Sequence, residues 1–256
     1  MDMFLRATLV LIRVASIVAF LPFFGEHYVP MQVRIGFSVA LSVCIVPVLP
    51  KEWGLHLFQT GMLNIGLQVL KEVGLGVSIG FLSKTLFEGI VGAANLVGYQ
   101  MGFGTANLML YGSDHQASPF AIFHQLLLLL LFLSMNFHQI LIRAIFTTFQ
   151  TVPVGGFGFT GLLSTSVLDI SALLFTTALQ LAAPLLVALL LTLAALGLLA
   201  RTVPQLNVFT ISFPVGFFVG LLMYIAMLPF FPDWMKAYFL SHFDWLFQNL
   251  LQFGHK

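Results

Sequence analysis

The chain has 256 residues, of which 59% are hydrophobic and only 7% are charged. Soluble domains carry about 25% charged residues, so this composition and a mean hydropathy of +1.03 indicate an integral membrane protein. The net charge of +1 gives no field that would attract nucleic acid. The single cysteine, Cys44, excludes an internal disulfide and a cysteine-based metal cluster.

The chain begins with two apolar segments that are separated by a polar corner. Residues 4–24 form the first, which contains Arg6 and Arg13 and ends at Pro22. Because Arg13 interrupts the run and no small-residue cleavage site follows it, we interpret this segment as a retained helix, not a signal peptide. Residues 35–49 form the second, which is shorter than the roughly 20 residues that a membrane span needs.

The third apolar segment, residues 63–87, contains three ionisable residues, Lys71, Glu72 and Lys84, and Glu88 follows it. Such groups usually face protein or water instead of lipid, so we expect this helix to pack on protein. Lys84 and Glu88 are four residues apart on one helix face and are predicted to pair. Glu72 could relay protons or could be a structural partner of Lys71.

A fourth segment starts at Gly89 and leads into residues 98–119, which we call the central stretch. The central stretch has four glycines, two methionines and three aromatic residues. A glycine costs about 1 kcal/mol against alanine inside a helix, and Gly112 to Asp114 has the composition of a turn. Irregular backbone persists in hydrocarbon only when it is buried in protein or lines an aqueous cavity. The central stretch is therefore either close to a path through a protein assembly or an exposed loop between membrane helices.

Three further apolar segments follow, at residues 120–149, 170–200 and 208–231. Pro184 is expected to kink the second of these, and a polar connection, residues 201–207, separates the last two into a helical hairpin. The sequence therefore predicts an all-α membrane protein with about six to seven apolar helical segments, broken and hairpin-like.

The sequence lacks the patterns of common catalytic and metal sites. His115, His124 and His138 match no compact ligand motif. No serine hydrolase elbow, phosphate loop or zinc-protease helix is present. We therefore predict a protein that is not an enzyme and has no cofactor and no metal.

Several motifs in a fixed order resemble one family, the FliR proteins of the flagellar export gate, which are related to the T component of injectisome type III secretion. The resemblance covers almost the whole chain. Its motifs are Pro22 to Glu26, Val29-Pro30, Arg34 to Gly36, Gly98 to Phe103, Asn136 to His138, Val152 to Gly155, Arg201 to Phe209 and Phe213 to Gly216.

The resemblance implies a single export-gate domain over residues 1–256, with a FliP-like part at about 1–165 and a FliQ-like helical hairpin and tail at about 166–256. It implies partners: several copies of FliP and FliQ homologues, FlhB-like and FlhA-like export proteins, unfolded flagellar subunits that pass through the centre, and membrane lipid, but no nucleic acid. The location implied is the bacterial inner membrane at the flagellar basal body, with the complex raised towards the periplasm.

The resemblance also implies that a loop in the central stretch, roughly residues 103–118, plugs the closed pore. Apolar side chains of a flexible loop close a pore by excluding water. The family often has phenylalanines and an Asp-Pro pair there, whereas this chain has Thr105 and Leu108 at places where aromatics are common. The side chains predicted to close the pore are Phe103, Leu108, Met109, Leu110 and Tyr111.

The connection of residues 201–207 is predicted to serve assembly through four residues, Arg201, Pro204, Gln205 and Asn207. A polar turn between two membrane helices would need such residues in any case, since Gln205 and Asn207 can satisfy the unpaired groups of helix ends.

Three alternative functions stay open at this point. The nearest is an SctT-type subunit of an injectisome, which shares the architecture. A small-solute transporter with broken helices would show inverted repeats, and the sequence has no clear internal repeat. A membrane enzyme would need a clustered polar site, which the sequence does not show.

Overall fold

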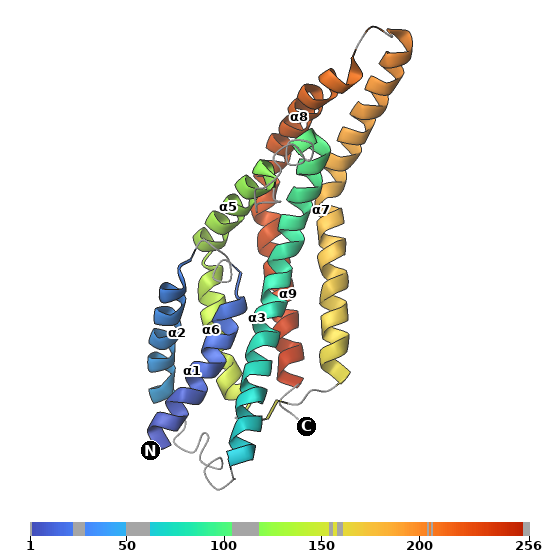
Figure 1. Cartoon of the computed structure of the whole chain (residues 1–256). Helices are drawn as coiled ribbons and strands as arrows, with labels where there is room; N and C mark the ends of the chain where they lie inside the picture. The colour runs from blue at the N-terminus through green and yellow to red at the C-terminus, as the bar shows by residue number, and fades with distance from the viewer. Residues whose placement is uncertain are drawn as a thin grey trace. The chain divides into compact units, whose positions relative to one another are not determined.

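The computed structural model describes residues 2–22, 29–49, 62–103, 118–153, 156–157, 161–203, 205 and 207–252. Every regular element in these ranges is a helix (Figure 1). The elements are α1 (Asp2–Phe20), α2 (Met31–Ile45), the 3₁₀ turn η1 (Val46–Val48), α3 (Met62–Gly98), the π-helical turn η3 (Tyr99–Phe103), α5 (Pro119–Ser134), α6 (Phe137–Thr151), α7 (Gly161–Thr202), α8 (Val208–Met227), the 3₁₀ turn η4 (Leu228–Phe230) and α9 (Phe231–Gln252).

Four helical stretches among the described residues are long and apolar enough to cross a membrane. They are Met31–Val48, Asn64–Phe103, Leu168–Thr202 and Thr210–Phe243. The bent pair α5 and α6 makes a fifth if it is counted as one broken span. The prediction of an all-α membrane protein with broken apolar segments is confirmed.

The predicted boundary between the third and fourth segments is wrong, because α3 continues without a break from Met62 to Gly98. Gly89 lies in the middle of this helix. A Cβ atom there would stand 3.3 Å from the carbonyl oxygen of Leu174 on α7. Because Gly89 has no side chain, α7 can approach α3 closely at this position, as is common at glycines in membrane helices. The glycine does not end α3.

The single helix predicted over residues 120–149 is also wrong, because α5 ends at Ser134 and α6 begins at Phe137. Asn136 between them has the left-handed backbone conformation, with φ 59°. Asparagine tolerates this conformation better than most residues. The predicted start of the segment is nearly right, since Ser118 caps α5 by accepting a hydrogen bond from the Ala121 amide at 3.1 Å.

The last two apolar segments are helices α7 and α8, with a change of chain direction between them (Figure 1). α7 begins at Gly161, earlier than predicted, and continues through Pro184 to Thr202. α8 is followed after the short turn η4 by α9, which is a helix of the predicted tail.

The chain folds into two compact units that interleave along the sequence. Unit 1 contains residues 1–87, 136–171 and 240–256. In unit 1, α1 packs on α2, and the side chains of Val10 and Val14 on α1 are buried.

Two glycines of α3 lie against α1 within unit 1. A Cβ at Gly76 would stand 2.6 Å from Ser16 Cβ, and a Cβ at Gly80 would stand 2.6 Å from Phe20 Cβ. Because these positions have no side chain, the two helix backbones can approach closely. Glycine at these two positions therefore permits the close contact between α1 and α3.

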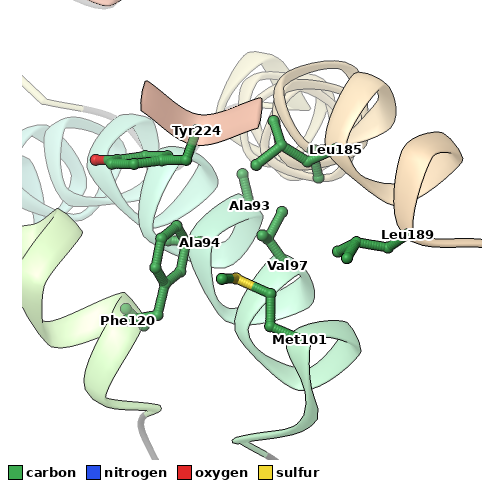
Figure 2. Packing of buried hydrophobic residues seen from close by; sticks show 10 residues of the cluster. Ala93, Ala94, Val97, Met101, Phe120, Leu185, Leu189 and Tyr224 are labelled. Carbon is green, nitrogen blue, oxygen red and sulfur yellow. The ribbon is translucent and has the colours of Figure 1, made fainter. Parts of the chain in front are cut away.

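Unit 2 contains residues 88–135 and 172–239. Its core is a cluster of small, aliphatic and aromatic side chains from α3, η3, α5, α7 and α8 (Figure 2). The buried members are Ala93, Ala94, Val97, Met101, Phe120, Ala121, Ala182, Leu185, Leu189 and Tyr224.

Candidate functional site

The start of the central stretch is held on α8. The π-helical turn η3 ends the long helix α3, and Gly102 within it has φ 97°, a conformation that L side chains rarely adopt. The ring of Phe213 fills the space beside Gly102, where a Cβ would stand 2.5 Å from a ring carbon. This contact requires glycine for both its backbone conformation and its size.

Phe103 continues this contact through two aromatic pairs. Its ring meets Phe213 edge to face with 6.3 Å between centroids, and it meets Phe217 in the same manner at 5.8 Å. Such pairs contribute about 0.5–1.5 kcal/mol each beyond the area that they bury. The two rings on α8 therefore hold Phe103, the last described residue before the gap in the central stretch.

Met101 anchors the same turn at a second place on α8. Its side chain is 1% exposed and lies against Gly220 of α8, where a Cβ would stand 2.7 Å from Met101 Cγ. Figure 2 shows Met101 among Val97 and Leu189 of the unit 2 cluster. A flexible thioether suits this place because it fills an irregular gap between helices.

The structure thus places one of the predicted plug residues, Phe103, at the start of the central stretch and half-buried against α8. The other four, Leu108, Met109, Leu110 and Tyr111, lie outside the described residues. Their part in closing a pore stays a prediction.

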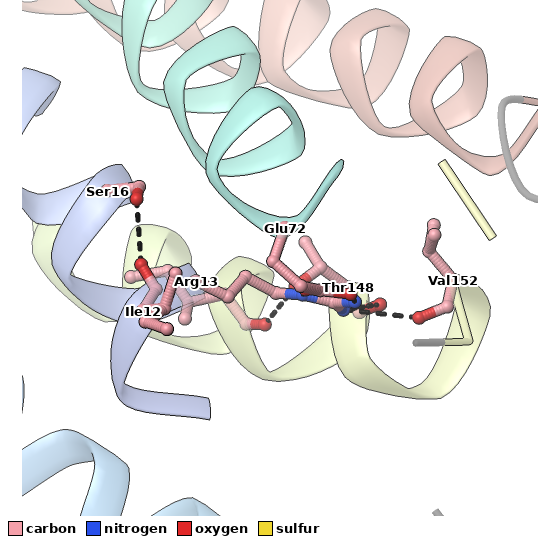
Figure 3. Close-up of polar contacts among 7 residues, drawn as sticks. Ile12, Arg13, Ser16, Glu72, Thr148 and Val152 are labelled. Atoms are coloured by element: carbon pink, nitrogen blue, oxygen red, sulfur yellow. Dashed lines mark hydrogen bonds and ion pairs between the residues drawn. The ribbon is translucent and has the colours of Figure 1, made fainter. Parts of the chain in front are cut away.

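A buried ion pair forms the polar centre of unit 1 (Figure 3). Arg13 of α1 donates from Nε to Oε2 of Glu72 on α3 at 2.5 Å and from Nη2 to Oε1 at 3.0 Å. The two side chains are 0% and 1% exposed. The bidentate geometry satisfies both carboxylate oxygens, which is what a buried carboxylate needs.

The same guanidinium also binds the C-terminal end of α6. Arg13 Nη1 donates to the backbone oxygens of Thr148 and Val152, each at 3.1 Å, and its carbon Cζ lies 4.6 Å from the centre of the Phe149 ring. The last carbonyls of a helix have no partner within the helix, so the arginine caps α6 while it neutralises Glu72. One side chain therefore fixes α1, α3 and α6 to one another.

This ion pair is a feature that the sequence reasoning missed. The sequence suggested Lys71 as a structural partner of Glu72, but the carboxylate is paired with Arg13. The signal that could have found it is the position of both charges within long apolar runs, because a charge in such a run usually has a partner of opposite sign. With both oxygens of Glu72 engaged by Arg13, the geometry favours a structural role over proton relay.

The predicted charge pair on α3, Lys84 with Glu88, has both residues half-buried, one turn apart on an uninterrupted helix. Their pairing stays a prediction. Of the four predicted assembly residues, Arg201 lies in the last turn of α7 and is exposed, Gln205 and Asn207 are exposed in the connection to α8, and Pro204 lies outside the described residues. Asn207 caps α8, because its side chain accepts a hydrogen bond from the backbone amide of Thr210 at 3.3 Å.

Comparison with known proteins identifies the family. The model of the family described as "Bacterial export proteins, family 1" matches residues 4–242. The flagellar biosynthetic protein FliR of Escherichia coli K12 is 31% identical over 236 residues, which cover 92% of this chain and 89% of the relative. FliR of Bacillus subtilis 168 is 31% identical over 88% of this chain and 86% of the relative.

A more distant relative extends the same likeness. FliR of Aquifex aeolicus VF5 is 26% identical over 243 residues, which cover 94% of this chain and 91% of the relative. These matches run through α1 and α3, which carry the buried ion pair, and through η3 and α8, which hold the start of the central stretch. The chain therefore belongs to the FliR family of bacterial export proteins.

Proposed function

We propose that this chain joins FliP and FliQ homologues in a flagellar type III export gate and forms with them the channel for unfolded flagellar proteins. The observation that carries the proposal is the family match over residues 4–242, together with FliR relatives that align along nearly their whole length. FliR proteins are non-enzymatic components of the flagellar export apparatus in the inner membrane, so the function of this chain lies in assembly and conduction.

The distribution of apolar side chains supports a role in an assembly. α7 carries exposed large apolar residues over most of its length, and these need either lipid or other helices around them. They include Phe175, Leu179, Val187, Leu190, Leu191 and Leu198. In contrast, the charges of α1 and α3 at Arg13 and Glu72 are buried within the chain itself.

Native mass spectrometry tests the proposal after co-expression of the chain with its neighbouring export genes and gentle purification in detergent. One copy bound to several smaller membrane subunits is the expected result. A lone monomer or a self-dimer, with the partner proteins demonstrably present in the membranes, would overturn it. The transporter alternative would then be examined with a panel of solutes.

The finer division of the chain and its placement in the membrane belong to the same proposal. We infer a FliP-like part at about residues 1–165 and a FliQ-like hairpin at about 166–256, which the pair α7 and α8 supports. The complex is proposed to stand raised towards the periplasm, beside FlhB-like and FlhA-like proteins. The turn that holds Arg201 and Asn207 is exposed and is proposed as an assembly contact, so its substitution should reduce the subunits retained in the native mass spectrum.

The central stretch is proposed as the plug of the closed channel. What supports this is its apolar and glycine-rich composition and the way it starts, with Gly102 in a conformation that favours glycine and Phe103 packed on α8. A segment with one end fixed on a helix can move aside as a unit when a substrate enters. The rings of Phe213 and Phe217 would remain as the fixed end.

The plug proposal predicts ion leakage in a variant that lacks the closing side chains. Replacement of Phe103, Met109 and Leu110 by glycine should increase leakage through the assembled complex, because a smaller apolar surface excludes water less well. The matched control replaces Phe103 and Met109 by leucine and keeps the surface apolar, so it should stay closed. Equal leakage of the wild-type and glycine complexes, at equal amounts in the membrane, would contradict the proposal.

A further inference from the structure

Unit 1 contains a groove of about 380 Å³ between α2 and α6. Apolar side chains from both helices form most of its wall, among them Leu41, Ile45, Ile142 and Phe146. Arg143 of α6 also lines the groove. The groove therefore joins an apolar wall to a cationic group, and both must be matched by whatever occupies it.

Arg143 supplies the charge of this groove, and no acidic residue lies among the described residues that line it. The side chain of Arg143 is exposed, and its guanidinium makes no hydrogen bond or ion pair with the part of the chain that the structure describes. A charge of this kind is unstable against hydrocarbon unless water or an anion accompanies it. The groove thus has a cation whose partner must come from outside the described chain.

Gln139 places a second donor beside this cation. It also lines the groove and lies one turn before Arg143 on the same face of α6. Its amide nitrogen donates one hydrogen to Oδ1 of Asn136 at 3.2 Å, and a primary amide has a second N–H to offer. The guanidinium is a planar fork that fits the oxygens of a phosphate or a carboxylate. The polar side of the groove therefore suits an anionic oxygen group.

The place of the groove along α2 indicates which anion lies there. Helix α2 and the turn η1 form the candidate membrane span Met31–Val48, and the lining residues Leu41, Cys44 and Ile45 lie near its C-terminal end. Phospholipid headgroups lie at the ends of spans, where the hydrocarbon core stops. Only 17% of this span is buried within the chain, so most of its surface needs lipid or another protein around it.

We propose that the groove holds an anionic phospholipid, whose phosphate binds Arg143 beside Gln139 and whose acyl chain lies against Leu41, Ile45 and Phe146. One lipid supplies both the negative charge and the apolar chain that the groove requires. A carboxylate on a neighbouring subunit would match the charge, but a helix is 10–12 Å across and would lie over the groove without filling it. Free phosphate would leave the apolar wall uncovered.

Photo-cross-linking of lipid to the assembled export complex tests the proposal. The complex is placed in phosphatidylcholine nanodiscs with a trace of phosphatidylglycerol or phosphatidylcholine, each with the same diazirine-bearing acyl chain. Cross-linked peptides of α2 and α6 are then measured by mass spectrometry. We expect a yield about fivefold higher from phosphatidylglycerol, the effect of one basic residue on binding to an anionic lipid. Equal yields from the two lipids would overturn the proposal, because they would show no recognition of the headgroup.

Substitutions at Arg143 test the contact with the headgroup. Arg143→Gln should lower the phosphatidylglycerol yield to that of phosphatidylcholine, and Arg143→Lys, which keeps the charge, should retain most of the preference. The matched control is Lys236→Gln, which removes an exposed cation on α9 in unit 2 and should leave the preference unchanged. A preference that survives in Arg143→Gln would overturn the proposal.

A second pair of variants tests the apolar wall. Cys44 is exposed and lines the groove, so Cys44→Trp should fill the space and remove most of the cross-linking by both lipids. Val43→Trp is the matched control, since Val43 is 66% exposed on the same helix and does not line the groove. It should cross-link as the wild type does. Equal yields from the two tryptophan variants would place the lipid elsewhere and overturn the proposal.

The same measurement identifies a protein occupant. If neither lipid cross-links to α2 or α6 while both cross-link to other helices of the complex, a neighbouring chain covers the groove and the proposal is wrong. If Arg143→Gln does not assemble, the comparison of the two lipids on the wild type and the two tryptophan variants decide the question. The proposal rests on this groove alone and does not depend on which partners the chain assembles with.

Discussion

In unit 1 the contact among α1, α3 and α6 is organised around one buried ion pair, whereas in unit 2 the helices meet through alanine, methionine and aromatic side chains. Arg13 makes its bonds at fixed positions and angles to Glu72 and to two carbonyl oxygens, one in the last turn of α6 and one just after it. In unit 2, by contrast, the flexible side chain of Met101 fills the space between helices. The two units thus represent directional and non-directional ways of joining helices.

The two kinds of helix contact differ in the substitutions that they tolerate. A buried charge that loses its partner is strongly unfavourable, so the contact in unit 1 is specific and responds to any change at Arg13 or Glu72. A core of apolar side chains loses stability in proportion to the volume removed and accepts swaps that conserve volume. The start of the central stretch, at Met101 and Phe103, therefore lies on the more adaptable of the two kinds of packing.

The largest effect is expected at the ion pair. Arg13→Met removes the bidentate partner of the buried Glu72 carboxylate and should destabilise the protein by about 3–5 kcal/mol. The loss is measured as the fall in the temperature at which half of the purified complex survives heating in detergent. The double variant Arg13→Met/Glu72→Leu removes both charges and should recover much of that loss. A double variant no more stable than the single one would show that the carbonyl bonds to α6, not the ion pair, dominate.

A smaller loss is expected in the core of unit 2. Met101→Ala should cost about 2–5 kcal/mol, because it leaves a cavity beside Gly220. Met101→Leu nearly conserves the volume and should cost less than about 1.5 kcal/mol. Met31→Ala, at a residue that is 73% exposed, is the control and should leave the same heating curve unchanged. Equal losses for alanine and leucine at position 101 would contradict adaptable packing there.

The close approach of α3 to α1 can be tested with a pair of glycines on one helix. Gly76→Ala brings a Cβ to 2.6 Å from Ser16 Cβ and 2.9 Å from the Arg13 carbonyl oxygen, and should cost about 1–3 kcal/mol. Gly66→Ala meets no atom within 4 Å and should stabilise the helix by up to about 1 kcal/mol. Two changes of the same sign in thermal survival would argue against the tight contact in unit 1.

The smallest effect is expected from the predicted pair on α3. Lys84→Gln and Glu88→Gln, alone and together, form a double-mutant cycle. A pair four residues apart on a helix contributes about 0.3–0.5 kcal/mol, so the coupling energy should fall in that range. We also expect these variants to lower the yield of assembled complex more than its conduction. Normal yield with altered transport would reverse that view.

Much of the fold could be predicted from the sequence, because long apolar runs require helices in a membrane. The wrong predictions concern the ends of helices, at places where a residue can either end a helix or pack within it. Gly89 was interpreted as the start of a new segment, but it permits the approach of α7. Asn136 has no glycine or proline beside it in the sequence, and its left-handed backbone divides α5 from α6. Composition alone cannot separate a glycine that breaks a helix from one that packs it.

The site was predictable only in part, because its contacts join residues far apart in the chain. The motifs placed Phe103 at the start of the central stretch, but they could not show that Phe213 and Phe217 receive its ring. Likewise, no spacing rule connects Nδ1 of His124 with the hydroxyl oxygen of Tyr224, which lie 2.9 Å apart.

The membrane class, the helical fold and the family follow from the composition and from the order of motifs along the chain. The partner of each buried charge follows only from the way the helices pack. Arg13 and Glu72 pair because helix packing brings them together, and a charge in an apolar interior is stable only beside an opposite charge with its hydrogen bonds complete. The sequence leaves Lys71 as one candidate partner of Glu72, but adjacent residues on a helix point in different directions.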